Sequence, residues 1–190
     1  LKVSNIQKQN GADLIINISA SPFRENKFKD RVNLVRSKVN EIKIPFLYCN
    51  LVGAQDELVF DGSSFALDKN GDCISHCKSF EEDILYTDLE SHSTKHIKYA
   101  SKCEDLFNAL CLGIKDYFEK TKNKEAVIGL SGGIDSAVVA CIASYALGNK
   151  SVYGVSMPSK FSSEHSKFDA EELAKNLNIN YQSISIQNIV

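Results

Sequence analysis

The chain has 190 residues, of which 43% are hydrophobic and 24% are charged. This length and balance are typical of a globular protein with a sizeable core, and they exclude a disordered or fibrous chain. Because 22 Lys and Arg stand against 24 Asp and Glu, the formal net charge is -2. We therefore expect neither nucleic acid nor a membrane surface as a partner. No apolar run approaches the roughly 20 residues that span a bilayer.

The cysteines indicate a reducing compartment. Four of the six lie in or beside apolar segments, namely Cys49, Cys103, Cys111 and Cys141. Free cysteines in such places usually act as small hydrophobic residues, so we expect a cytoplasmic protein. Cys73, His76 and Cys77 form a local cluster. It has no second ligand pair downstream, and we do not interpret it as a zinc site.

The first hundred residues predict a strand, a helix, a strand and a hairpin. Apolar strands are expected near residues 12–18 and 44–52, with an amphipathic helix over 24–40 between them. The Asp-Gly pair at 61–62 and the Asn-Gly pair at 70–71 predict tight turns on either side of a short apolar run. The loop after the first strand lies at its carboxyl end, where α/β proteins place their sites.

The second half predicts alternating strands and helices. A helix is expected over 102–120, with Ser101 and Glu104 forming a capping box at its start. The segments that follow are a strand at 126–130, a glycine loop, a helix closed by Gly148, a strand at 151–157, a helix at 168–177 and a strand at 181–186. This alternation predicts a parallel, doubly wound sheet. We expect two domains, at 1–85 and 101–190, joined by a polar linker at 86–100.

The loop Ser131-Gly132-Gly133-Ile134-Asp135-Ser136 carries the clearest chemical signal. Its glycines let the backbone turn tightly and expose N–H groups, and the following helix adds the positive end of its dipole, which favours a polyphosphate. A carboxylate at Asp135 would repel that anion unless a cation lay between them, so Asp135 is interpreted as a Mg²⁺ ligand. The alternative is a helix N-cap aspartate beside a structural turn.

This loop is neither a Walker A motif nor a dinucleotide fingerprint. It resembles the S-G-G-x-D-S loop of the PP-loop ATP pyrophosphatases, which adenylate a carbonyl or carboxylate oxygen and release pyrophosphate. The segments around it are more specific. Residues 106–148 and 152–179 resemble the synthetase domain of glutamine-dependent NAD⁺ synthetases, and GADLIINISASPF and YCNLVGAQDELVFDGSSF resemble the second half of their nitrilase-type glutaminase domain. A departure is Leu51, where relatives commonly carry Gln.

The resemblance implies part of a nitrilase-type α-β-β-α sandwich followed by part of a doubly wound parallel-sheet, PP-loop ATP pyrophosphatase domain. The implied reaction is ATP-dependent amidation of deamido-NAD⁺ to NAD⁺ through an adenylated intermediate, with ammonia from glutamine. ATP and Mg²⁺ are the expected cofactors, and deamido-NAD⁺, glutamine or ammonia the small-molecule partners. We expect homo-oligomers of the full-length protein. Another PP-loop amidoligase, such as GMP synthetase, or a non-catalytic nucleotide-binding module are the alternatives.

The resemblance also assigns site residues. The ATP-binding residues are expected to be Gly129, Leu130, Ser131, Gly132, Gly133, Ile134, Asp135 and Ser136. Met157 is added because it ends the strand next to the loop, a position suited to the adenine and ribose of ATP; the alternative is a core residue. Ser21 and Lys27 match positions that contact glutamine, with Arg31 as a competing basic residue; a turn serine and a solvated helix lysine are equally good interpretations. The family's catalytic Glu, Lys and Cys precede Ala12, so we expect an internal part of a longer protein that contains no catalytic residue of the glutaminase.

Overall fold

A computed structural model describes residues 3–90 and 94–187. The chain divides into two compact units, residues 1–109 and 110–190, and each is described by itself. Within the described ranges, no helix combines the length and the apolarity that crossing a bilayer would need.

The first unit contains a four-stranded sheet with the order β1-β2-β5-β6. Its elements are α1 (Val3–Gln9), β1 (Ile15–Ser19), α2 (Lys27–Ile42), β2 (Phe46–Asn50), β3 (Val52–Gln55), β4 (Leu58–Asp61), β5 (Phe65–Leu67) and β6 (Cys73–His76). Strands β1 and β2 are parallel, and the pairs β2–β5 and β5–β6 are antiparallel. The expected strand, helix and strand are therefore confirmed, whereas β6 and α1 were not predicted.

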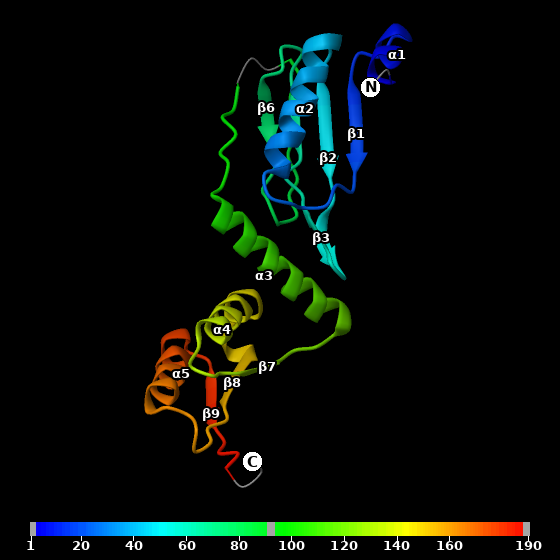
Figure 1. The fold of residues 1–190 in the computed structure, drawn as a ribbon. Helices are drawn as coiled ribbons and strands as arrows, with labels where there is room; N and C mark the ends of the chain where they lie inside the picture. The colour runs from blue at the N-terminus through cyan, green and yellow to red at the C-terminus, as the bar shows by residue number, and fades with distance from the viewer. Residues whose placement is uncertain (1–2, 91–93, 188–190) are drawn as a thin grey trace. The chain divides into compact units, whose positions relative to one another are not determined.

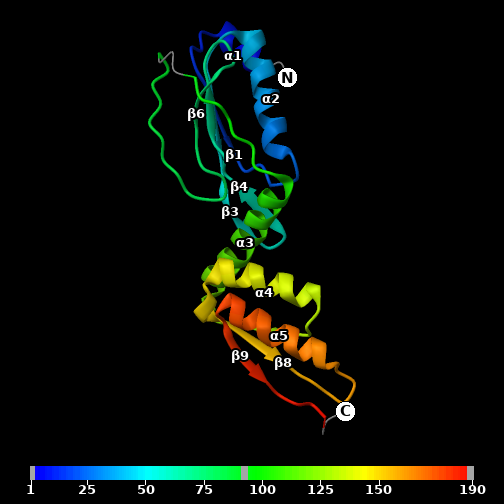
Figure 2. The ribbon, with the colours of Figure 1, turned by 90° about the vertical axis from the view of Figure 1, so that its left-hand side faces the viewer.

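Helix α2 packs along one face of this sheet (Figures 1 and 2). Its apolar positions recur at helical spacing, so Val32, Val35 and Val39 all point to the sheet, and Val32 and Val39 are fully buried. The partners that they meet come from every strand of the sheet: Ile15, Phe46, Phe65, Leu67 and Cys73. This core holds the loop after β1 and the start of α2 in place.

Strands β2 to β5 form one long hairpin whose register is continuous. Phe46 lies opposite Leu67 at its base, and Gln55 lies opposite Leu58 at its tip. The chain therefore reverses at residues 56–57, and the turn expected at Asp61-Gly62 is wrong. Gly62 has a left-handed φ of 61° but lies inside one arm, where its N–H donates to the Leu51 carbonyl at 2.9 Å. A glycine with a left-handed φ is found in strand irregularities as well as in turns.

The turn at Asn70-Gly71 is confirmed. It joins β5 to β6, and Gly71 has a φ of 86°. The Asp68 carboxylate accepts hydrogen bonds from the N–H groups of Asn70 and Asp72, at 2.9 and 2.8 Å. This is the arrangement by which an aspartate side chain stabilises a turn.

Helix α3 (Lys102–Thr121) contains the division between the units. The predicted capping box is present at its start: the Glu104 N–H donates to the Ser101 hydroxyl at 3.2 Å, and the Ser101 N–H donates to the Glu104 carboxylate at 3.5 Å. Two orphan donors of the first turn are thereby satisfied.

The second unit has a parallel sheet with the order β7-β8-β9, as the alternation of segments predicted. Its elements after α3 are β7 (Ala126–Gly129), α4 (Ile134–Leu147), η1 (Asn149–Ser151), β8 (Val152–Ser156), α5 (Glu164–Leu177) and β9 (Asn180–Ser183). Helix α5 begins before the predicted residue 168 because the Ser163 hydroxyl caps it, accepting from the Ser166 N–H at 3.1 Å. Small residues of α4 and α5 pack on the sheet, namely Ala140, Ala143, Ala170 and Ala174.

Candidate functional site

The glycine loop joins the carboxyl end of β7 to the first turn of α4. Its conformation is held by hydroxyls: the Ser131 and Ser136 oxygens lie 3.1 Å apart, and the Ser136 hydroxyl donates to the Gly133 carbonyl at 3.0 Å. The N-cap of α4 is Gly133, without a side-chain cap. Asp135 lies in the first turn instead, so the N-cap aspartate alternative is wrong. The N–H groups at this helix end are therefore not capped by a side chain, as an anion site requires.

Gly132 is required at its position for two reasons. Its φ is 78°, and a Cβ built on it would lie 2.3 Å from the Ser166 carbonyl oxygen. Ser166 belongs to the first turn of α5, so the loop and the start of this helix are in direct backbone contact. The exposed loop is thus packed against a second helix end.

A cavity of about 240 Å³ opens beside the loop. Its lining residues are Gly129, Leu130, Ser131, Ser156, Met157, Pro158, Ser162, Ser166 and Lys167. Gly129, Leu130, Ser131 and Met157 are four of the nine residues predicted to bind ATP. The other five, Gly132, Gly133, Ile134, Asp135 and Ser136, continue from the loop into α4 without lining the cavity. Ser156, Ser162, Ser166 and Lys167 were missed, because only the fold brings β8 and α5 to the loop.

Asp135 presents an exposed carboxylate in the first turn of α4. Among residues 3–90 and 94–187, no group of three or more His, Cys, Asp or Glu side chains could enclose a metal ion. A single carboxylate nevertheless fits Mg²⁺, which is usually held by one or two carboxylates together with phosphate oxygens and water. The donor set is therefore suited to a metal that arrives with a polyphosphate.

Ser21 lies in the loop after β1, and both of its backbone polar groups are held by Asn50. The Ser21 N–H donates to the Asn50 side-chain oxygen at 2.9 Å, and the Asn50 amide donates to the Ser21 carbonyl at 3.3 Å. Asn50 is the last residue of β2 and is buried. The loop is therefore fixed to the neighbouring strand rather than exposed as a free turn.

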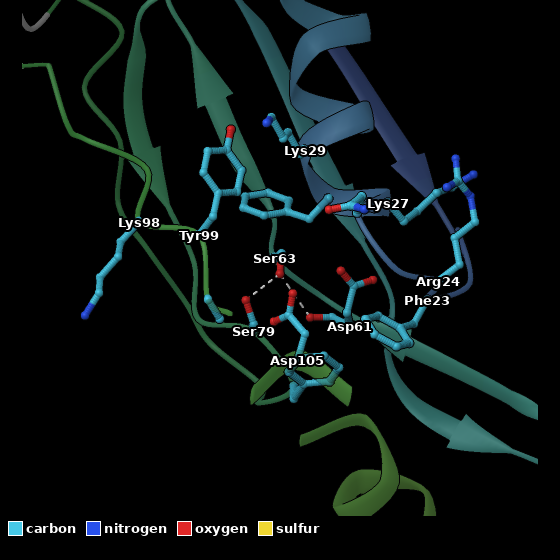
Figure 3. A pocket seen from close by; sticks show the side chains of 14 residues that line it. Phe23, Arg24, Lys27, Lys29, Asp61, Ser63, Ser79, Lys98, Tyr99 and Asp105 are labelled. Carbon is cyan, nitrogen blue, oxygen red and sulfur yellow. Dashed lines mark hydrogen bonds between the residues drawn. The ribbon is translucent and has the colours of Figure 1, made fainter. Parts of the chain in front are cut away.

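Lys27 is the first residue of α2 and lines a different part of the surface, a cavity of about 210 Å³. Figure 3 shows that the Asp61, Ser63, Ser79 and Asp105 side chains lie close together in this cavity, whereas Lys98 points away from them. The Ser63 and Ser79 hydroxyls are 2.7 Å apart. Ser21 is not among the lining residues, so this cavity does not contain both predicted glutamine contacts.

Arg31, the competing basic residue, is buried in an ion pair with Asp61. Their side chains are only 4% and 3% exposed. The Arg31 guanidinium also donates to the Ser21 carbonyl at 3.3 Å. Arg31 therefore contacts buried groups of the protein and not solvent, and it stabilises the loop that contains Ser21.

Asp105 and His76, both in the first unit, have shifted pKa values. Burial raises the pKa of the Asp105 carboxyl, and the negative charges of Asp61 and Glu104 raise it further. Burial lowers the pKa of His76, while the Asp83 carboxylate opposes that shift. In both cases the low-dielectric surroundings disfavour the charged form.

Two families match successive parts of the chain: carbon–nitrogen hydrolase over residues 3–99, and NAD synthase over residues 106–190. The expected pair of domains, in that order, is thereby confirmed.

Similar curated proteins are glutamine-dependent NAD⁺ synthetases. The one from Synechocystis is 44% identical over 182 residues, covering 93% of this chain and 33% of the relative. The one from Aquifex aeolicus is 37% identical over 215 residues, covering 94% of this chain and 38% of the relative. The chain thus spans about a third of the length of the curated relatives it matches.

A glutamine-dependent NAD⁺ synthetase structure from Acinetobacter baumannii, in complex with ADP, matches 98% of this chain and 36% of its own, with a TM-score of 0.88 and 29% identity. The enzyme from Cytophaga hutchinsonii has the same fold, with a TM-score of 0.77 at 20% identity over 95% of this chain and 37% of its own. The chain belongs to the carbon–nitrogen hydrolase family, and its carbon–nitrogen hydrolase segment is followed by an NAD synthase segment. Over nearly all its length it is similar to glutamine-dependent NAD⁺ synthetases.

Proposed function

We propose that the protein carrying this chain catalyses ATP-dependent amidation of deamido-NAD⁺ to NAD⁺, with ammonia released from glutamine. The single observation that carries this proposal is the succession of a carbon–nitrogen hydrolase segment and an NAD synthase segment in one chain. GMP synthetase is disfavoured, because its glutaminase resembles a different type, with a Cys-His-Glu triad, whereas the first part of this chain matches a carbon–nitrogen hydrolase. A non-catalytic nucleotide-binding module is the second candidate.

In the second unit, the glycine loop binds the pyrophosphate end of ATP. The N–H groups at the start of α4 and the hydroxyls of Ser131 and Ser136 contact the phosphates, and Asp135 holds Mg²⁺, which neutralises their charge. Met157, at the cavity beside the loop, contacts the adenine or ribose. The bound ADP in the structure from Acinetobacter baumannii supports an adenine nucleotide.

In the first unit, Ser21 and Lys27 contact glutamine. None of the cysteines in this chain is assigned as the nucleophile of glutamine hydrolysis, which requires a thiolate. Burial raises the pKa of Cys73, Cys77 and Cys111, so these three are poor thiolates near neutral pH. We infer that the catalytic Glu, Lys and Cys of the glutaminase precede Ala12.

The substrates are the small molecules deamido-NAD⁺ and glutamine or ammonia, without nucleic acid or membrane partners, and the full-length protein is a cytoplasmic homo-oligomer. Residues 1–85 and 101–190 belong to the two domains. Residues 86–100 connect them, in keeping with the described residues between Ser79 and Lys102, which form no helix or strand.

The test measures the full-length protein with ATP, Mg²⁺ and deamido-NAD⁺, supplied with either glutamine or ammonia. We expect equal amounts of NAD⁺, AMP and pyrophosphate from both nitrogen sources. D135N should abolish the reaction with both, while D13N, at an exposed aspartate of the first unit, should leave it unchanged. Nucleotide binding without any NAD⁺ would establish the non-catalytic module instead.

A further inference from the structure

The loop that presents Ser21 is fixed by two buried side chains from other elements. Asn50, on β2, exchanges two hydrogen bonds with the Ser21 backbone, at 2.9 and 3.3 Å. Arg31, on α2, adds a third hydrogen bond to the Ser21 carbonyl at 3.3 Å. The Ser21 peptide groups therefore have contacts from a strand and from a helix at once.

Asp61 joins these two side chains. Its carboxylate pairs with the Arg31 guanidinium and accepts a hydrogen bond from the Asn50 amide at 3.4 Å. Arg31, Asn50 and Asp61 are 4%, 7% and 2% exposed. Hydrogen bonds to ionised groups are strong in such surroundings, and the loss of one partner leaves the other unsatisfied. The three side chains therefore act as one rigid network.

The network holds the Ser21 backbone and leaves its side chain unused. Among residues 3–90 and 94–187, no side chain or backbone group hydrogen-bonds to the Ser21 hydroxyl. Because the peptide is fixed, the position of the Ser21 Cα and Cβ atoms is set before any ligand arrives, which lowers the ordering cost of binding. This arrangement is expected of a side chain that must lie at a defined position to contact a ligand.

We propose that Asn50 and Arg31, linked through Asp61, are positioning residues that orient Ser21 for glutamine. The inference rests on the proposed function of Ser21 as a glutamine contact. Neither residue touches the substrate: both act through the Ser21 peptide. Their loss should therefore weaken the use of glutamine while leaving the use of ammonia intact.

N50D and R31K are the informative variants. N50D keeps the side-chain shape but removes the donor to the Ser21 carbonyl and places a second carboxylate beside Asp61. R31K keeps the positive charge next to Asp61 but removes the guanidinium group, whose second nitrogen donates to the Ser21 carbonyl. V39A is the matched control, because it destabilises the core of the same unit without touching the network.

The full-length protein is assayed with glutamine and with ammonia. We expect both variants to raise the KM for glutamine about tenfold, the equivalent of one good hydrogen bond, and to leave the ammonia-dependent kcat and KM within about twofold of wild type. Lower pH should bring the glutamine KM of N50D closer to that of the wild type. The reason is that the new carboxyl, once protonated, can again donate a hydrogen bond. Raised KM in V39A to the same degree would assign the effect to lost stability and overturn the proposal.

Amide hydrogen exchange separates this inference from the proposed function. Residues 19–23 should exchange faster in N50D and R31K than in wild type and V39A, whatever the enzyme's activity. Unchanged exchange there would refute the positioning role. Faster exchange with an unchanged glutamine KM would also refute it, since Ser21 would then be fixed without serving glutamine. Wild-type protein that forms NAD⁺ from ammonia but not from glutamine would refute the glutamine part of the proposed function itself.

Discussion

Gly132 lies against the backbone of Ser166, at the point where a Cβ would come within 2.3 Å of the Ser166 carbonyl oxygen. The glycine loop is thus shaped from outside by α5, in addition to the hydrogen bonds between its own hydroxyls. A loop held on two sides keeps its N–H groups aligned, which favours a preformed anion site.

Gly132→Ala should therefore impair both the loop and the packing of α5. Backbone atoms cannot yield as a flexible side chain does, so we expect a loss of about 1–3 kcal/mol in the free energy of unfolding. ATP affinity should fall as well. Unfolding by denaturant and titration with Mg-ATP are the measurements.

Gly148→Ala is the matched control for that substitution. Gly148 also has a left-handed φ, of 85°, but no atom lies within 4 Å of its Cβ position. It shares the backbone strain without the clash, so it should cost only about 1 kcal/mol and leave ATP affinity unchanged. Equal effects of the two substitutions on ATP affinity would show that the contact with Ser166 is unimportant.

If Lys27 contacts glutamine as proposed, Lys27→Ala should raise the KM for glutamine in the full-length protein, because the substrate would lose a cationic partner. The expected increase is about tenfold, as for a charge-assisted hydrogen bond. Lys38→Ala, on the same helix, removes the same charge away from the cavity. If both variants have the wild-type KM, Lys27 is a solvated helix lysine, the alternative that the sequence left open.

The stability of the first unit should fall as the pH decreases below about 6.5. The His76 ring stacks on Phe28 with centroids 4.9 Å apart, and its Nε2 atom is buried with no hydrogen-bond partner in the described structure. Burial lowers its pKa from the ordinary value of 6.5. Between that value and the lowered pKa, the unfolded chain binds more protons than the folded one, so acid favours unfolding.

His76→Phe keeps an aromatic ring against Phe28 and removes the titrating group. The variant should gain stability relative to wild type as the pH falls from about 7 to about 5. Hydrogen exchange of the β6 amides, measured across that range, reports the local free energy of opening. A difference between variant and wild type that did not change with pH would contradict the assignment.

Ser101→Ala should destabilise the start of α3 by about 1 kcal/mol, because it removes the N-cap acceptor. The reciprocal hydrogen bonds with Glu104 predict coupling between the two positions. In a cycle of Ser101→Ala, Glu104→Ala and the double variant, the two single losses should therefore sum to more than the loss in the double variant. Additive losses would mean that the capping box is not formed in solution.

Local signals in the sequence were sufficient for the glycine loop, the capping box at Ser101 and the order of strands and helices in the second unit. Each depends on residues within a few positions of one another. The start of α5 was placed too late because Ser163 was not recognised as its cap. Strand β6 was missed, since Cys73–His76 is only four residues long and half of it is polar.

Contacts between residues far apart in the sequence could not be predicted from local sequence patterns. Arg31 looked like any basic residue on an amphipathic helix, and nothing near it in sequence reveals that Asp61, 30 residues away, would bury it. The Asp61-Gly62 pair has the composition of a turn, yet strand pairing over the length of the hairpin outweighs that local preference. The lining of the cavity beside the loop likewise depends on how α5 packs.

The continuous register of the long hairpin makes its arms less tolerant of length changes than its tip. Asn50 and Asp61 lie on opposite arms, and their contact depends on the register in which Val52 lies opposite Asp61. Removing one residue from a single arm would shift the pairing and turn every following side chain to the opposite face. Extra residues at positions 56–57 would leave both arms in register. Variation in the length of this hairpin should therefore be confined to its tip.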